Sequence, residues 1–212
     1  MKRRPRSRPA SAGRLALVAT VLAGACAGAP EADRSPGELR GRLLPSPLEK
    51  PEFTLADTRG EPFSFRDRTD GRLTLLFFGF TNCPDVCPVH MANLGAVLSR
   101  FSHEIRARVS VVFVTTDPDR DSPERMRAWL DRFDHDFIGL RGDIDEINRI
   151  QASLGLAAAV RGGDGADGGY TVGHAAQVIA FTPDNRAHVV YPFGTRQDDW
   201  LNDMPRLLRA DW

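Results

Sequence analysis

Two apolar stretches constrain the fold of this chain most strongly. Leu73–Phe80 and Val109–Thr115 each have the length of a strand and consist mostly of apolar residues. Stretches of this kind, without alternation of apolar and polar residues, are typical of strands covered on both faces. Each is followed by apolar residues at helical spacing, over residues 89–101 and from about residue 123 to 133. The chain is therefore expected to form a sheet with helices on both sides.

The remaining patterns complete an α/β order. They predict a hairpin over residues 53–65, a short strand at 137–140, a helix from about 144 to 154, a hairpin over 176–191 and a final helix from about 198 to 209. The Gly- and Asp-rich stretch 161–169 is expected to be a loop. The fold class is therefore α/β, with an N-terminal β-hairpin and a central mixed sheet flanked by helices. Thioredoxin-like folds have this order of elements.

The N-terminus has the composition of an export signal. A basic stretch that ends at Arg14 is followed by the apolar run Leu15–Ala25, which is too short to span a bilayer. Leu22–Cys26 resembles the lipobox of bacterial lipoproteins, in which the cysteine is acylated and becomes the new N-terminus. We predict a signal peptide over residues 1–25 and lipidation at Cys26. A plain secretory signal or an uncleaved anchor is the alternative.

Composition then divides the rest of the chain. Residues 26–49 are rich in proline, glycine and charged residues and lack apolar periodicity, so they predict a lipidated N-terminus followed by a flexible linker. Residues 50–212 have the length of one domain. An exported, membrane-anchored domain that faces the periplasm or another extracytoplasmic space is expected.

Charge excludes one class of partner. Six of the 28 basic residues precede Cys26, whereas all 28 acidic residues follow it. The exported part is therefore mildly acidic and contains no basic run, so no nucleic-acid partner is predicted. The only membrane contact expected is the lipid anchor.

Two cysteines lie where the first buried strand gives way to a helix. Cys83 and Cys87 are separated by three residues, which places their sulfurs about one turn apart. They could form a disulfide or hold one metal ion. Cys87 falls near the first helical turn, where free N–H groups and the helix dipole favour a thiolate.

A histidine is the expected third ligand. Two sulfurs with an imidazole suit Cu(I), Cu(II) or Zn(II), and structural zinc sites usually have four protein ligands, so copper is favoured. His174 stands between the Gly-rich stretch and a predicted strand, a junction that folds back on the cysteine turn in thioredoxin-like folds. The other histidines are expected at the surface or in packing: His90 solvated beside a buried Met91, His103 and His135 exposed, His188 within a strand.

Three blocks of sequence resemble the SCO/SenC family of copper proteins. They are Phe77–Pro88, Thr115–Glu124 and Tyr170–Ala175, in this order. The resemblance implies a thioredoxin-like fold with copper bound by Cys83, Cys87 and His174. It also implies two partners, a copper donor protein and the copper-binding subunit of cytochrome c oxidase, whose dinuclear copper centre would be matured. The family commonly has Asp before the ligand histidine, whereas this chain has Gly173; Asp164 or Asp167 could replace it.

Two functions follow from the same residues. The first is a copper chaperone, which captures copper and passes it on by ligand exchange. The second is a thiol–disulfide oxidoreductase, in which Cys83 and Cys87 form the redox pair and Cys83 attacks. Such reductases usually have two residues between their cysteines, and they need no imidazole ligand, so the chaperone is favoured. A purely structural disulfide would close a very short loop and add little stability.

Overall fold

In the computed structural model of this chain, residues 38–164 and 170–209 are described. The strands are β1 Arg42–Glu49, β2 Thr54–Asp57, β3 Pro62–Ser64, β4 Leu73–Gly79, β5 Val109–Thr115, β6 Ile138–Arg141, β7 Val160–Asp164, β8 Tyr170–Gly173, β9 Val178–Phe181 and β10 Arg186–Tyr191. The helices are α1 Phe65–Arg68, α2 Val86–Leu98, α3 His103–Arg106, α4 Pro123–Leu130, α5 Ile144–Ser153 and α6 Gln197–Leu207. No helix among these residues is both long and apolar enough to cross a bilayer.

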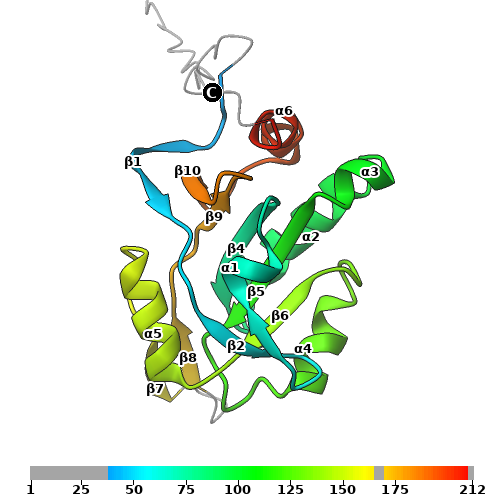
Figure 1. Ribbon diagram of the computed structural model, residues 1–212. Coiled ribbons are helices and arrows are strands. Elements are labelled where there is room, and N and C mark those ends of the chain that lie inside the picture. Colours follow the sequence, from blue (N-terminus) through cyan, green and yellow to red (C-terminus); the bar gives the residue numbers. More distant parts are fainter. Residues whose placement is uncertain (1–37, 165–169, 210–212) are drawn as a thin grey trace, which may run out of the picture. The chain divides into compact units, whose positions relative to one another are not determined.

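Eight strands form one mixed sheet, in the order β1-β10-β9-β4-β5-β6-β2-β3. The two apolar stretches, β4 and β5, lie side by side at its centre and run parallel, with Leu73 opposite Val109 and Gly79 opposite Thr115. The strand β6 continues this parallel part, whereas β9 pairs antiparallel with β4. The mixed α/β fold expected from the sequence is confirmed (Figure 1).

Helices cover both faces of the sheet, as the apolar stretches predicted. Leu73, Leu75 and Phe77 of β4 pack in one buried cluster with residues of α2, α4 and α6. The alternate residues Leu76 and Phe78 pack in a second cluster with residues of α1 and α5. Because successive side chains of a strand point to opposite faces, the single stretch β4 supplies both halves of the core.

The predicted linker is too long. Residues 42–49 were expected to belong to it, but they form strand β1, which pairs antiparallel with β10. Pro45 and Pro47 lowered the strand signal, yet β1 is the outermost strand, where proline is tolerated because one edge forms no ladder hydrogen bonds. The register with β10 shifts between Leu43 and Leu48, the stretch that contains both prolines.

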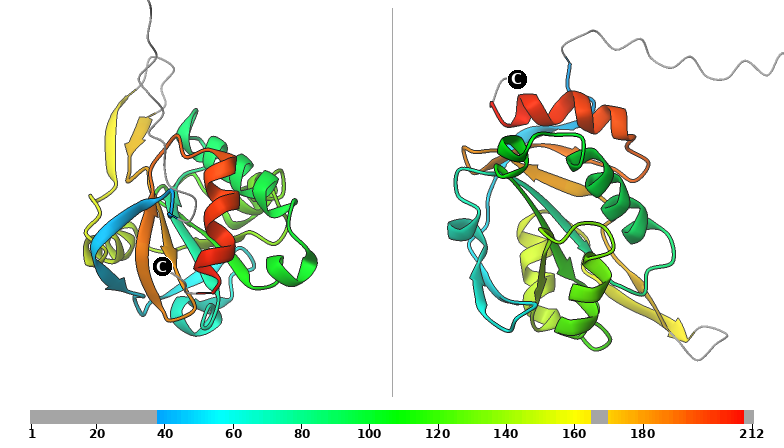
Figure 2. Two further views of the ribbon diagram at one scale, coloured as in Figure 1. Left: turned by 90° about the horizontal axis from the view of Figure 1, so that it is seen from above. Right: turned by 90° about the vertical axis from the view of Figure 1, so that its right-hand side faces the viewer.

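The Gly- and Asp-rich stretch is also more regular than predicted. Val160–Asp164 is strand β7, which pairs with β8 in a separate two-stranded sheet. This hairpin extends beyond the main sheet (Figure 2). Glycine is uncommon in strands, so the composition predicted a loop. The strand β8 ends at Gly173, directly before His174, so the hairpin determines the position of the His174 backbone.

Candidate metal centre

The cysteine turn connects the centre of the sheet to α2. The helix begins at Val86, three residues earlier than predicted, and Cys87 lies in its first turn. The side chain of Cys87 is buried in the core, whereas Cys83 is only half-buried. Neither of the two forms a disulfide. One sulfur is therefore fixed by packing and the other is accessible from outside.

His174 reaches the two cysteines, as predicted. Its Nε2 atom lies 3.5 Å from Cys87 Sγ, and the Nε2 and the two Sγ atoms all lie within 4.8 Å of one another. The imidazole makes T-shaped contacts with the Phe77 and Phe80 rings. This is the one group of at least three metal-ligating side chains among the described residues. Two soft sulfurs and one imidazole nitrogen are donors that suit copper.

The tautomer of His174 is determined by the backbone of the next residue. Its Nδ1 lies 3.0 Å from the carbonyl oxygen of Ala175. A carbonyl oxygen only accepts, so Nδ1 carries the proton, and in the neutral ring the lone pair on Nε2 faces the sulfurs. The Ala175 carbonyl thereby orients the imidazole, which is the role that a carboxylate at position 173 would have. Asp167 and the side chain of Asp164, the candidates from the sequence, lie outside the described residues.

The two sulfurs differ in charge, and in the opposite sense to our prediction. A hydrogen bond from the Cys87 thiol, together with backbone N–H groups of Asp85 and Cys87, lowers the pKa of Cys83 to about 4. Burial and the neighbouring Cys83 raise the pKa of Cys87. The free N–H groups at the start of α2 thus point at Cys83 Sγ, with Cys87 N at 3.4 Å. Cys83 is the thiolate and Cys87 the protonated thiol.

This difference predicts selective alkylation of the reduced, metal-free protein. Iodoacetamide should modify Cys83 before Cys87, at a rate that changes little between about pH 8 and pH 5.5, because the pKa of Cys83 is about 4 and its thiolate persists over this range. Peptide mass spectrometry after timed quenching would measure both sites. A rate at Cys83 that falls about tenfold per pH unit below pH 8 would show an ordinary thiol instead.

Gly79 makes room for the Cys87 sulfur. A Cβ atom at this position would lie 2.7 Å from Cys87 Sγ and 2.8 Å from Cε1 of Phe77. Gly79→Ala is therefore expected to displace the sulfur and to lower the free energy of unfolding by about 1–3 kcal/mol through overpacking. Urea denaturation and a copper titration would measure the two effects. Gly163→Ala is the control, because a Cβ there meets nothing within 4 Å.

A buried carboxylate holds the cysteine turn against the sheet. Asp121 is fully buried, and it accepts hydrogen bonds from the backbone N–H of Thr81 at 3.0 Å and from the Thr115 hydroxyl at 2.6 Å. The Thr81 hydroxyl donates to the same carboxylate. Thr115 ends β5, so Asp121 joins the residues just before Cys83 to the central strands.

A second cluster, formed by Asp117, Arg120 and Tyr170, holds the β7–β8 hairpin against the loop after β5. Asp117 is buried, pairs with Arg120 and accepts a hydrogen bond of 2.6 Å from the Tyr170 hydroxyl. Arg120 also donates to the Tyr170 carbonyl at 3.0 Å. The Tyr170 ring lies against the guanidinium groups of Arg120, at 3.7 Å, and Arg161, at 3.5 Å. The loop after β5 thereby restrains the hairpin that leads to His174.

The exposure of the other four histidines agrees with the prediction except at His90. The prediction that His90 is solvated is wrong, since only 3% of it is exposed, while the predicted burial of Met91 is confirmed. His103 and His135 are exposed and His188 is half-buried, as expected. Asp85, between the cysteines, is exposed and is not among the grouped ligands.

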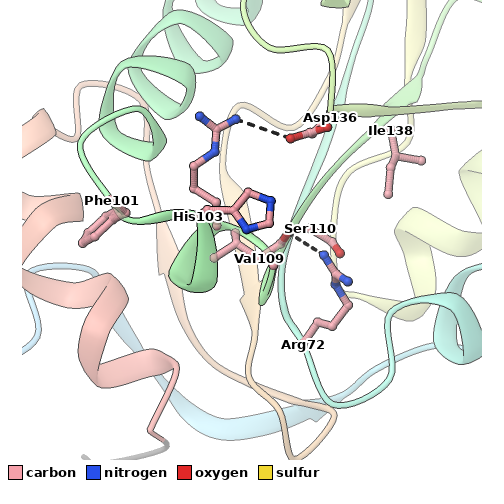
Figure 3. Close-up of a pocket in the computed structure, with 9 residues that line it drawn as sticks. Arg72, Phe101, His103, Val109, Ser110, Asp136 and Ile138 are labelled. Atoms are coloured by element: carbon pink, nitrogen blue, oxygen red, sulfur yellow. Dashed lines mark hydrogen bonds and ion pairs between the residues drawn. The ribbon is translucent and has the colours of Figure 1, made fainter.

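A surface hollow lies away from this centre. It has a volume of about 550 Å³ and is lined by residues at the starts of β4 and β5, among them Arg72, Val109 and Ser110 (Figure 3). Arg72 donates to the Val109 carbonyl at 3.0 Å, and Arg106 pairs with Asp136 across the hollow. The cysteines follow the other end of β4, and neither they nor His174 line this hollow, so it is not part of the metal centre.

Known proteins share this sequence and fold. Residues 43–209 match the SCO1/SenC family. A protein of Stutzerimonas stutzeri is 32% identical over 168 residues, which are 78% of this chain and 80% of that protein. The structure of Bradyrhizobium japonicum ScoI with copper bound is 30% identical, with a TM-score of 0.67, over 76% of this chain and 99% of ScoI.

A more distant structure shares the fold. BsSco, described as a member of the Sco family of cytochrome c oxidase assembly proteins, is 20% identical, with a TM-score of 0.60, over 78% of this chain and 97% of BsSco. The family match covers most of the chain, and the family's thioredoxin-like fold and a Cys-Cys-His group that could bind copper are both present. This chain belongs to the SCO1/SenC family.

Proposed function

We propose that this domain binds one copper ion through Cys83, Cys87 and His174 and delivers it to the dinuclear copper centre of cytochrome c oxidase during assembly. The convergence of the three ligand atoms within 4.8 Å supports this proposal most directly. The copper bound to the relative ScoI supports copper as the ion that is delivered. BsSco belongs to a family of cytochrome c oxidase assembly proteins, which supports the oxidase as the destination.

The exposure of the ligands is suited to transfer. Cys83 is half-buried and ionised, so it is the ligand that an incoming ion meets first, and Cys87 and His174 complete the group. Three protein ligands leave copper with an open side. Thiols of an acceptor could bind there and displace the three ligands one at a time, so that copper never passes through water as a free ion.

A transfer assay tests the delivery role. The reduced domain, loaded with Cu(I), is mixed with the soluble copper-binding domain of an oxidase subunit whose cysteines are reduced. After the two proteins are separated by chromatography, we expect most of the copper on the acceptor. Copper that stays with the donor, or a domain that binds no copper when reduced, would contradict the proposal.

Thiol–disulfide exchange is the second candidate, because a thiolate beside a protonated thiol favours it. Cys83 would attack an acceptor disulfide, which forms a mixed disulfide and releases one acceptor thiol. Cys87 would then attack the mixed disulfide, which releases the second acceptor thiol as the Cys83–Cys87 disulfide forms. The metal-free reduced domain is mixed with the oxidised acceptor, and the acceptor thiols are counted. Two new acceptor thiols per domain in this experiment, together with no copper transfer in the transfer assay, would assign the reductase role.

We also propose export and attachment to the membrane through acylated Cys26. The basic and apolar pattern of residues 1–25 supports this, and these residues lie outside the described part of the chain. Mass spectrometry of the protein expressed with its full leader should find an N-terminal peptide that begins at a diacylated Cys26. Cys26→Ser should release the protein from the membrane fraction.

A further inference from the structure

One buried histidine takes no part in the predicted ligand group. His90 belongs to α2 and lies one turn after Cys87, with only 3% of its surface exposed. Its ring packs against Phe77, with 4.9 Å between the ring centroids, and meets the Phe193 ring edge-on at 5.7 Å. Phe193 itself is 43% exposed, whereas the imidazole that it contacts is buried.

The polar contact of His90 reaches the segment that carries His174. Its Nε2 lies 2.9 Å from the carbonyl oxygen of Ala176, two residues after His174. The carbonyl can only accept, so Nε2–H is the donor whichever charge the ring has. Residues 174–177 have no helix or strand of their own. Their position therefore depends on side-chain contacts more than on backbone ladders.

We infer that His90 is a positioning residue, which holds the segment 174–177 against α2 so that the His174 imidazole stays within bonding distance of the two sulfurs. The inference rests on the proposed copper site and adds a residue to it. Because α2 carries both Cys87 and His90, a single helix determines the position of the Cys87 sulfur and, through His90, the position of the segment 174–177 relative to it. The contacts of Tyr170 with Asp117 and Arg120 restrain the chain on the N-terminal side of His174. The hydrogen bond of His90 restrains it on the C-terminal side.

Two replacements of His90 separate the hydrogen bond from packing. His90→Met introduces an apolar side chain of similar size that has no donor, whereas His90→Gln places an amide N–H near the original Nε2. His90→Phe serves as a second apolar variant if His90→Met is insoluble. Met91→Leu, a nearly volume-conserving change at the adjacent buried position, is the control for general disturbance of the core.

We expect His90→Met to lower copper affinity by about 10- to 100-fold, in the range found for residues that orient metal ligands. In the metal-free protein, amide exchange of residues 174–178 should become about 5- to 10-fold faster, because one hydrogen bond that restrains the segment is lost. His90→Gln should remain within about threefold of wild type in both measurements, since its amide can make the same bond. Met91→Leu should change neither.

The outcomes are distinct. Wild-type copper affinity and exchange in His90→Met, or equal losses in His90→Met and His90→Gln, would overturn the positioning role and leave His90 a packing residue. If the wild-type domain fails to bind copper, the proposed function fails instead. The exchange measurement on metal-free protein still decides then whether His90 holds the segment.

Discussion

His174→Ala is expected to lower the affinity of the reduced domain for Cu(II) by more than about 100-fold, since even the loss of a group that only orients a ligand costs about 10- to 100-fold. The variant loses the only nitrogen donor of the group, whose Nε2 lies 3.5 Å from Cys87 Sγ. The loss should be smaller for Cu(I), because two thiolates alone suit this softer ion. Competition with a chromophoric chelator would measure both affinities.

The fold should survive this replacement. His174 is only half-buried, and it lies in a segment without regular secondary structure, so its removal is expected to change the free energy of unfolding by less than about 1 kcal/mol. His135→Ala is the matched control, since this imidazole is exposed and outside the group. Equal copper affinity in His174→Ala and His135→Ala would remove His174 from the site.

Asp203→Ala is expected to have the largest effect on stability. The carboxylate of Asp203, on α6, is fully buried. It accepts hydrogen bonds from the backbone N–H of Arg40 at 2.8 Å and of Gly41 at 2.9 Å, and from the Tyr191 hydroxyl at 2.7 Å. It thereby joins the residues just before β1 to α6 and to β10.

The variant should lose about 3–4 kcal/mol of unfolding free energy, because hydrogen bonds to a charged group contribute about 1.5–3 kcal/mol each and are not additive. The Tyr191 hydroxyl, which is fully buried, would also lose its acceptor. Urea denaturation followed by circular dichroism would measure the change. Asp198→Ala, at an exposed position of the same helix, should cost less than about 1 kcal/mol. A loss below about 1 kcal/mol in Asp203→Ala would show that the network is dispensable.

The sequence by itself determined the fold class and the ligand types. Leu73–Phe80 and Val109–Thr115 predict buried central strands because both of their faces must be covered, and that property is local to each stretch. Cys83 and Cys87 are close in sequence, so their proximity follows from local geometry alone. His174 could be chosen among five histidines only because its position between elements, and the resemblance to a family, pointed to it.

Tertiary structure decided what depends on residues distant in sequence. The burial of His90, the hydrogen bond that Asp121 accepts from the backbone of Thr81 and the pairing of β1 with β10 each need a partner more than 35 residues away, and no local pattern encodes it. The same holds for the charge on the sulfurs. Local spacing favoured Cys87 as the thiolate, but the fold buries that sulfur beside Gly79, and backbone N–H groups of the turn donate to Cys83 instead. Burial and hydrogen bonding act through space, so only the folded chain shows which cysteine is ionised.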